Sequence, residues 1–220
     1  MSQIQLIIFD MDGLMFDTER LSDKAWYKIG ERYGYQFTDT LLDEIKGSNM
    51  KDIIQKFYDA FGDDFPIQSL RKEKIDIMHQ EITEHGITIK KGLSSCIAWA
   101  KSHHISIAIA SSSRRQTIDF YLENAKLTGV FDFIMSGDKV KESKPNPEIF
   151  LKCCEHFNIP VEHALVLEDS YNGIRAAVNA NIKVVWVPDL ALVPDDAKPL
   201  IYREAKDLTM IPTIVEELNS

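Results

Sequence analysis

Cysteine is scarce in this chain of 220 residues, and long apolar runs are missing. None of the three cysteines, Cys96, Cys153 and Cys154, pairs with another at the C-x-x-C spacing of a zinc or redox motif. Adjacent cysteines bridge each other only with strain, so we expect free thiols in a reducing compartment. No stretch approaches the roughly 20 apolar residues of a membrane helix. The early apolar run is short and interrupted by Asp10, unlike a signal peptide. We therefore expect a cytoplasmic protein that does not bind membranes.

Positive charge is also in short supply. The formal net charge is −9, and no basic stripe runs through the sequence. A nucleic-acid surface needs such a stripe, so we expect no nucleic-acid partner. The hydrophobic content of 45% and charged content of 27% are ordinary for a globular protein. The length suits one core with a small accessory domain.

Several common functional motifs are absent from the sequence. No G-x-G-x-x-G follows the first apolar run, so a dinucleotide site would lack its phosphate turn. There is no G-K-[ST] of a P-loop and no H-E-x-x-H of a zinc protease. An EF-hand loop needs glycine at its sixth position, whereas Gly13 is the fourth residue counted from Asp10.

The most informative stretch lies near the N-terminus. Residues 6–9 are all apolar, which is typical of a buried strand in a parallel sheet, and Asp10, Asp12 and Gly13 follow directly. A strand buried on both faces has no room for carboxylates, so both aspartates should lie where the strand ends, facing a crevice.

A helical block is expected at residues 16–89. Apolar residues recur every four positions over Leu21–Tyr33, which indicates a first helix. A short second helix is indicated up to Lys46, a third around Ile53–Phe61 and a longer fourth over Ile67–His85. No strand pattern interrupts this block. We therefore predict a helical bundle inserted after the first strand. The segments that connect it to the sheet are expected near Phe16–Thr18 and Ile89–Gly92.

From Lys91 onward, strands and helices alternate. We expect strands at residues 105–110, 131–135, 164–167 and 182–187, and helices at 93–103, 116–125, 147–157 and 170–179. This alternation predicts an α/β fold with a doubly wound parallel sheet. The expected division is a core of residues 1–15 and 90–220 and an inserted helical domain of residues 16–89.

Polar residues stand at the carboxyl ends of three predicted strands. Asp10 and Asp12 follow the first strand, Ser111 the second, and Glu168 and Asp169 the fourth. Lys144 lies between the third and fourth strands, before Pro145, which holds it extended. Each has an ordinary alternative: Ser111 as a helix cap, Lys144 as a solvated lysine, and the acidic pair as a favourable helix start. Since carboxyl ends of parallel strands share one edge, these residues can instead meet in one crevice.

The chain resembles the haloacid dehalogenase-like superfamily, specifically its phosphatases. It is similar to the subgroup with an α-helical cap, which includes β-phosphoglucomutase and many sugar-phosphate phosphatases. The motifs that carry the resemblance are Asp10-Met11-Asp12-Gly13, Ser111, Ser143-Lys144-Pro145-Asn146-Pro147 and Leu167-Glu168-Asp169-Ser170, followed by Asn172-Gly173-Ile174. It covers essentially the whole chain and implies a Rossmann-like core with a mobile helical cap.

Crowded carboxylates also argue for a cation. At roughly 4 Å and an effective dielectric of about 20, each pair costs about 4 kcal/mol. A divalent cation offsets this cost, and oxygen-only ligands favour Mg²⁺. The resemblance assigns Mg²⁺ contacts to the Asp10 carboxylate, the Asp12 backbone carbonyl and Asp169, with Glu168 as a further ligand or as a residue that holds the ligands.

The resemblance also implies roles in catalysis. Asp10 is the expected nucleophile that forms an aspartyl-phosphate, and Asp12 the general acid and base. Lys144 balances charge on the transferring oxygens, and Ser111 and Ser112 hold the phosphate. Cap residues around Asn49 are expected to face the substrate, a small phosphorylated metabolite.

Two alternative functions remain open at this stage. A phosphosugar mutase of the family looks for a histidine and an arginine in the cap, and the aligned positions carry Ser22 and Met50. Loss of that arginine removes a cation suited to a second phosphate, which favours a phosphatase. The other alternative is a binding protein that keeps the fold without turnover. Dehalogenases of the superfamily do not use a second aspartate such as Asp12. We expect a monomer, since a lidded enzyme of this kind needs no partner subunit.

Overall fold

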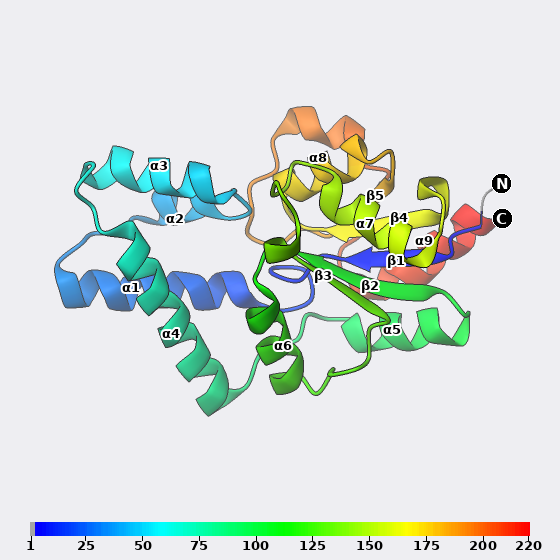
Figure 1. Ribbon diagram of the computed structural model, residues 1–220, viewed down its shortest axis with the longest axis horizontal. Coiled ribbons are helices and arrows are strands. Elements are labelled where there is room, and N and C mark those ends of the chain that lie inside the picture. The colour runs from blue at the N-terminus through cyan, green and yellow to red at the C-terminus, as the bar shows by residue number, and fades with distance from the viewer. Residues whose placement is uncertain (1–2) are drawn as a thin grey trace.

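The computed structural model describes residues 3–220 and shows one parallel sheet with helices on both of its faces (Figure 1). The strand order is β3-β2-β1-β4-β5-β6, and every neighbouring pair is parallel. The strands are β1 (Leu6–Phe9), β2 (Ser106–Ser111), β3 (Phe133–Ser136), β4 (Ala164–Glu168), β5 (Lys183–Trp186) and β6 (Arg203–Glu204). The predicted doubly wound α/β fold is confirmed.

The predicted helices are present with small shifts at their ends. The helices within the described residues are α1 (Thr18–Tyr33), α2 (Asp39–Ile45), α3 (Met50–Phe61), α4 (Ile67–His85), α5 (Leu93–Ser102), α6 (Arg115–Asn124), α7 (Glu148–Phe157), α8 (Tyr171–Asn179) and α9 (Ile211–Asn219). None of them, within residues 3–220, combines the length and the apolar character needed to cross a membrane.

The alternation of side chains along β1 divides the core into two layers. Ile7 and Phe9 point to the face covered by α5, α6 and α9, whereas Leu6 and Ile8 point to the face covered by α7 and α8. Since both faces are covered, the apolar run of β1 is fully buried.

Helices α1 to α4 lie to one side of the sheet in Figure 1 and contain a separate hydrophobic cluster. Phe57 is fully buried, and its ring lies 4.8 Å from that of Trp26 and 5.3 Å from that of Phe65. The cluster residues come only from α1 to α4 and their connections. This block is called the cap below.

Two chain segments join the cap to the sheet, and they run side by side. The Asp17 backbone N–H donates to the Thr88 carbonyl at 3.0 Å, and the Lys90 N–H donates to the Met15 carbonyl at 2.9 Å. Asp189, which follows β5, accepts from Lys90 Nζ at 2.6 Å and from Arg20 Nη1 at 3.2 Å. Both joints are therefore tied to one carboxylate of the part of the chain that contains the sheet, which is called the sheet domain below.

The cap also touches the sheet domain away from these joints. The Asn172 side-chain amide on α8 donates to the Gly47 carbonyl at 2.9 Å. The His79 ring on α4 lies 4.3 Å from the Phe120 ring on α6. The cap therefore contacts both α8 and α6.

Candidate active site

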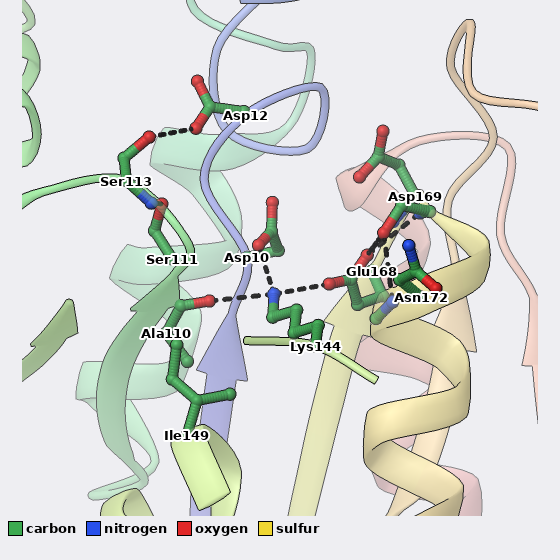
Figure 2. A network of polar contacts seen from close by, with 12 residues as sticks. Asp10, Asp12, Ala110, Ser111, Ser113, Lys144, Ile149, Glu168, Asp169 and Asn172 are labelled. Atoms are coloured by element: carbon green, nitrogen blue, oxygen red, sulfur yellow. Dashed lines mark hydrogen bonds and ion pairs between the residues drawn. The ribbon is translucent and has the colours of Figure 1, made fainter. Parts of the chain in front are cut away.

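The candidate site lies where the strand order reverses, between β1 and β4. Strands that follow β1 in sequence lie on both of its sides, and open α/β sheets bind ligands at such a point. Phe9 pairs with Leu167 in the sheet, so Asp10 and Glu168 leave the two strands side by side. Asp169 follows at once, and the predicted convergence of these three carboxylates is present (Figure 2).

Lys144 reaches into this crevice from the segment before α7. Its ammonium donates to Asp10 Oδ1 at 2.5 Å, to Glu168 Oε1 at 2.6 Å and to the Ala110 carbonyl at 3.0 Å (Figure 2). An ammonium has three N–H donors, so all of them are used. Burial disfavours the charged form of Lys144, but Asp10 and Glu168 outweigh this and raise its pKa. Lys144 is therefore a buried cation and not a solvated one.

Glu168 has both carboxylate oxygens occupied. Oε1 accepts from Lys144, while Oε2 accepts from the backbone N–H groups of Asp169 and Ser170 and from the Ser170 hydroxyl, each at 2.9 Å. A Cβ at Gly173 would lie 1.7 Å from Oε1, so the absence of a side chain there leaves room for Glu168. The sequence leaves two roles open for Glu168, that of a further metal ligand and that of a residue that holds the ligands. These hydrogen bonds favour the second role.

Asp10, Glu168 and Asp169 offer carboxylate oxygens that all lie within 4.8 Å of one another, and all three residues are buried. Burial raises the pKa of Asp10 to about 8 in spite of Lys144, with further contributions from Glu168 and Asp12. Burial, Glu168 and Asp10 together raise the pKa of Asp169 well above its usual value. Three buried carboxyl groups are therefore gathered around the single ammonium of Lys144.

Gly13 makes room for one of these carboxylates. Its φ of +79° is in the left-handed region, and a Cβ at this position would lie 2.2 Å from Asp169 Oδ2. A side chain there would clash with Asp169 as well as strain the backbone. The glycine of the first motif thus lets the loop after β1 approach the end of β4.

Asp12 is oriented by two hydroxyl groups that the sequence did not single out as site residues. Its Oδ1 accepts from Thr18 Oγ1 at 2.8 Å and its Oδ2 accepts from Ser113 Oγ at 2.9 Å. Ser113 is 101 residues away in sequence, so only the fold reveals the contact. Asp12 therefore has a fixed orientation, and it lies above Asp10 in Figure 2.

The predicted phosphate-binding serines lie in different surroundings. Ser111 is buried at the end of β2, and its hydroxyl accepts from the Ser113 backbone N–H at 3.1 Å. The Ser112 side chain is exposed, and within residues 3–220 it forms no hydrogen bond with the carboxylates. Ser111 lies on the same side as Asp10 in Figure 2, and Ser113 contacts the Asp12 carboxylate. Ser112 has no such contact within the described residues.

Asn49 is predicted to face the substrate, but its side chain forms hydrogen bonds within the cap. Its side-chain carbonyl accepts from the Asp52 backbone N–H at 3.1 Å, and its amide donates to the Asp52 carboxylate at 2.7 Å. These contacts make Asn49 the N-cap of α3.

Two charged residues of the cap, Glu19 and Lys74, interact electrostatically with Asp12. The Lys74 ammonium on α4 donates to Ser22 Oγ at 3.1 Å and lies 6.0 Å from the Trp26 ring centre. Burial lowers the pKa of Lys74. Burial and the charge of Asp12 raise the pKa of Glu19 to about 7. Lys74 has no sequence signal beyond its position on a helix, so only the structure could identify it.

Comparison with known proteins places this site in a family. The family model of the haloacid dehalogenase-like hydrolases matches residues 7–187, which include all the residues labelled in Figure 2. The chain belongs to this family.

Similar proteins of the family include phosphatases. A phosphorylated carbohydrates phosphatase of Thermotoga maritima is 30% identical over 187 residues, covering 83% of this chain and 84% of the relative. The crystal structure of CbbY from Rhodobacter sphaeroides in complex with phosphate is 26% identical with a TM-score of 0.79, covering 95% and 96% of the two chains. That of a putative β-phosphoglucomutase from Thermotoga maritima is 27% identical with a TM-score of 0.78, covering 98% and 100%. The chain is thus a haloacid dehalogenase-like hydrolase, as its motifs indicate.

Proposed function

We propose that this hydrolase is a Mg²⁺-dependent phosphatase that cleaves a small phosphomonoester, a sugar phosphate or a related metabolite, through an aspartyl-phosphate on Asp10. One observation carries the proposal. Lys144 bridges Asp10 and Glu168 while Asp10, Glu168 and Asp169 gather oxygen ligands within 4.8 Å. This arrangement joins a carboxylate nucleophile to the positive charge that a phosphoryl group requires.

The donor set fits Mg²⁺. The three carboxylates supply only oxygen atoms, and no histidine or cysteine belongs to the cluster. Burial and the neighbouring carboxylates raise the pKa values of Asp10 and Asp169, which a bound cation would oppose. Asp10, Asp169 and the Asp12 backbone carbonyl would hold the ion, with Glu168 fixing the end of β4 and Lys144. When bound, Mg²⁺ would neutralise charge on the phosphate and keep Asp10 ionised.

In the first step, an Asp10 carboxylate oxygen attacks phosphorus and the bond from phosphorus to the ester oxygen breaks. The leaving alkoxide takes a proton from Asp12, whose orientation is fixed by Thr18 and Ser113. Lys144 balances the charge that spreads over the transferring oxygens, and the Ser111 hydroxyl lies beside them.

In the second step, water replaces the alkoxide. Asp12 removes a proton from the water as its oxygen attacks phosphorus, and the bond between phosphorus and the Asp10 oxygen breaks. Inorganic phosphate leaves, Asp10 is again a carboxylate, and Asp12 is again protonated. One residue can serve both steps because the alcohol leaves from, and the water enters at, the same side of the phosphoryl group.

The cap would select the substrate and exclude water from the adduct. We propose that residues 16–89 form this lid and that the enzyme acts as a cytoplasmic monomer. The relatives support a sugar phosphate as the substrate class: one is a phosphorylated carbohydrates phosphatase, and CbbY has been crystallised with xylulose-1,5-bisphosphate.

The test is hydrolysis of p-nitrophenyl phosphate and of a panel of sugar phosphates with and without Mg²⁺. The wild-type chain should release phosphate only with the metal, and Asp10→Asn should abolish turnover. Glu155→Gln, on an exposed position of α7, should retain full activity as the control. Activity of Asp10→Asn near the wild-type level would refute the role of Asp10. Rapid isomerisation of glucose 1-phosphate with little free phosphate would instead identify a mutase.

A further inference from the structure

One buried carboxylate lies where the two segments that join the cap to the sheet domain come together. The Asp189 side chain is only 4% exposed, and its Oδ1 accepts from Lys90 Nζ at 2.6 Å and from Arg20 Nη1 at 3.2 Å. Its Oδ2 is buried and has no hydrogen-bond partner within residues 3–220. Both side-chain contacts of Asp189 are therefore made to cations at the joints, one in the first turn of α1 and one shortly before α5.

Burial distinguishes Asp189 from the surface ion pairs of this chain. An exposed pair contributes little to stability, because water and salt screen it. A buried carboxylate has lost its hydration, so it depends on the cations that face it, and removing one partner of such a pair is costly. The described residues offer Lys90 no other ion-pair partner. The charge of Asp189 should therefore matter to the joints more than a surface charge would.

The segment that carries Asp189 is also bonded to the candidate site. Trp186 pairs with Glu168 in the sheet, and the Val187 backbone N–H donates to the Glu168 carbonyl at 2.8 Å. The Trp186 indole N–H donates to the Asp169 carbonyl at 3.1 Å. These bonds attach the segment to the end of β4 only two residues before Asp189.

The same segment reaches the cap at a second place. A Cβ at Gly47, in the loop between α2 and α3, would lie 2.7 Å from Ser170 Cβ and 3.5 Å from Ala191 Cβ. The cap backbone thus packs closely against residues that follow β4 and β5. A rotation of about 10° at the start of α1, whose 16 residues span about 24 Å, would move its far end by about 4 Å. Close packing at Gly47 therefore requires that the joints hold the cap at a defined angle.

We propose that Asp189 is a positioning residue that holds the cap at the angle shown in Figure 1, through its ion pairs with Lys90 and Arg20. It acts through the cap and not on the reacting atoms. Because its segment is bonded to Glu168 and Asp169, the angle is set relative to the end of the strand that carries the site. The proposal goes beyond the proposed function, on which only its kinetic readout rests.

Hydrogen-exchange mass spectrometry of the full chain without metal tests the proposal. The variants are Asp189→Asn, Arg20→Gln, Lys90→Gln and the double variant Asp189→Asn/Arg20→Gln. Two reporters are the backbone N–H groups of Asp17 and Lys90, which donate across the paired joints. The third reporter is the peptide around Gly47, where the cap meets the sheet domain again.

Two other ion pairs of the chain provide matched controls. Lys91→Gln removes a pair with Asp207 that lies within the sheet domain, next to the joint in sequence. Lys28→Gln removes a pair with Glu81 that lies within the cap. Neither change touches the contacts of Asp189. Each should alter exchange at the reporters by less than about twofold, as expected for exposed substitutions.

Asp189→Asn should speed exchange at the reporters by roughly tenfold, because it weakens two charge-assisted hydrogen bonds. Arg20→Gln and Lys90→Gln should each speed it by roughly two- to fivefold, since each removes one partly exposed cation. Strands β1 and β4 should stay protected in every variant. The double variant should exchange no faster than Asp189→Asn, because both substitutions remove the same contact.

The kinetic readout uses a sugar phosphate that the wild-type chain hydrolyses. When the cap is held less firmly, a smaller fraction of the protein is ready to bind, which raises the apparent KM. We expect KM to rise by roughly two- to tenfold in Asp189→Asn while kcat changes by less than about twofold. A general loss of folded protein would instead lower kcat and leave KM unchanged.

Two results would overturn the role of Asp189. One is unchanged exchange at the reporters in Asp189→Asn, or in the half-exposed Arg20→Gln should the buried substitution prevent folding. The other is equal acceleration at the reporters and in β1 and β4, which would mean a general loss of stability. A wild-type chain that hydrolyses no phosphomonoester with Mg²⁺ would contradict the proposed function instead, and the exchange result would still decide the role of Asp189.

Discussion

Glu168 uses both of its carboxylate oxygens for contacts within the protein, and these contacts position its neighbours. One oxygen holds the Lys144 ammonium and the other holds the start of α8. Replacing it with glutamine keeps the size but removes the charge that attracts Lys144. We expect Glu168→Gln to lower kcat by roughly ten- to hundredfold and to raise the Mg²⁺ concentration needed for half-maximal activity.

A Mg²⁺ titration of activity checks this expectation for Glu168→Gln. Glu155→Gln, a charge-removing substitution on the exposed side of α7, should behave as the wild type. An unchanged kcat and an unchanged Mg²⁺ dependence in Glu168→Gln would show that its contacts are dispensable.

Glu19 should make the stability of the metal-free protein depend on pH. Burial and Asp12 raise its pKa from 4.5 to about 7, so the folded state binds the proton more tightly than the unfolded state does. Stability must then fall as the pH rises from about 4.5 to 7, and the whole penalty applies above 7. Glu19→Gln should therefore be more stable than the wild type at pH 8, by about 1–3 kcal/mol.

Urea unfolding in the presence of a chelator at pH 4.5 and pH 8 measures this difference. At the lower pH, the gain from Glu19→Gln should shrink, because the wild-type carboxyl is then also neutral. Glu31→Gln, on an exposed position of α1, should show no such trend. A gain from Glu19→Gln that is equal at both pH values would contradict the assigned pKa shift.

At the scale of elements, the cap has its own hydrophobic cluster and should lose structure on its own. Phe57 is buried between Trp26 and Phe65, and no cluster residue comes from the sheet domain. Phe57→Ala should cost about 3–5 kcal/mol within the cap, since it leaves a cavity in a packed core. Amide hydrogens of α1 to α4 should then exchange faster while those of β1, β2 and β4 stay protected.

Hydrogen-exchange mass spectrometry measures these segments separately. Phe150→Ala, at a fully buried position against the sheet, should have the opposite pattern and speed exchange in the strands. Equal acceleration in cap and strands with Phe57→Ala would mean that residues 16–89 are not a separate unit.

Most elements could be predicted because local signals mark their ends. Thr38 caps the start of α2, Gly34 caps the end of α1, and α4 has the predicted bounds. Strand β6 has only two residues, too short for any period to appear, and it was missed. Helix α9 was also missed, although Ile211, Ile214, Val215 and Leu218 follow helical spacing.

For the molecule as a whole, the sequence predicted which charged residues meet but not how each is held. Asp10, Glu168 and Asp169 stand at strand ends, and parallel topology brings strand ends together, whereas Lys144 lies in the segment between β3 and α7. The orientation of Asp12 depends on Ser113, a contact between short side chains that requires the folded geometry.

The central claim is that Asp10 receives the phosphoryl group. The most direct test is to trap the aspartyl-phosphate and to locate the phosphoryl group on Asp10. Nitrophenolate leaves without needing a proton, so Asp12→Asn should still form the adduct from p-nitrophenyl phosphate but hydrolyse it slowly. After an acid quench, peptide mass spectrometry should find one phosphoryl group on Asp10, dependent on Mg²⁺ and absent in Asp10→Asn. Steady release of phosphate by the wild-type chain, with Asp10 unmodified in every quenched sample, would contradict the account.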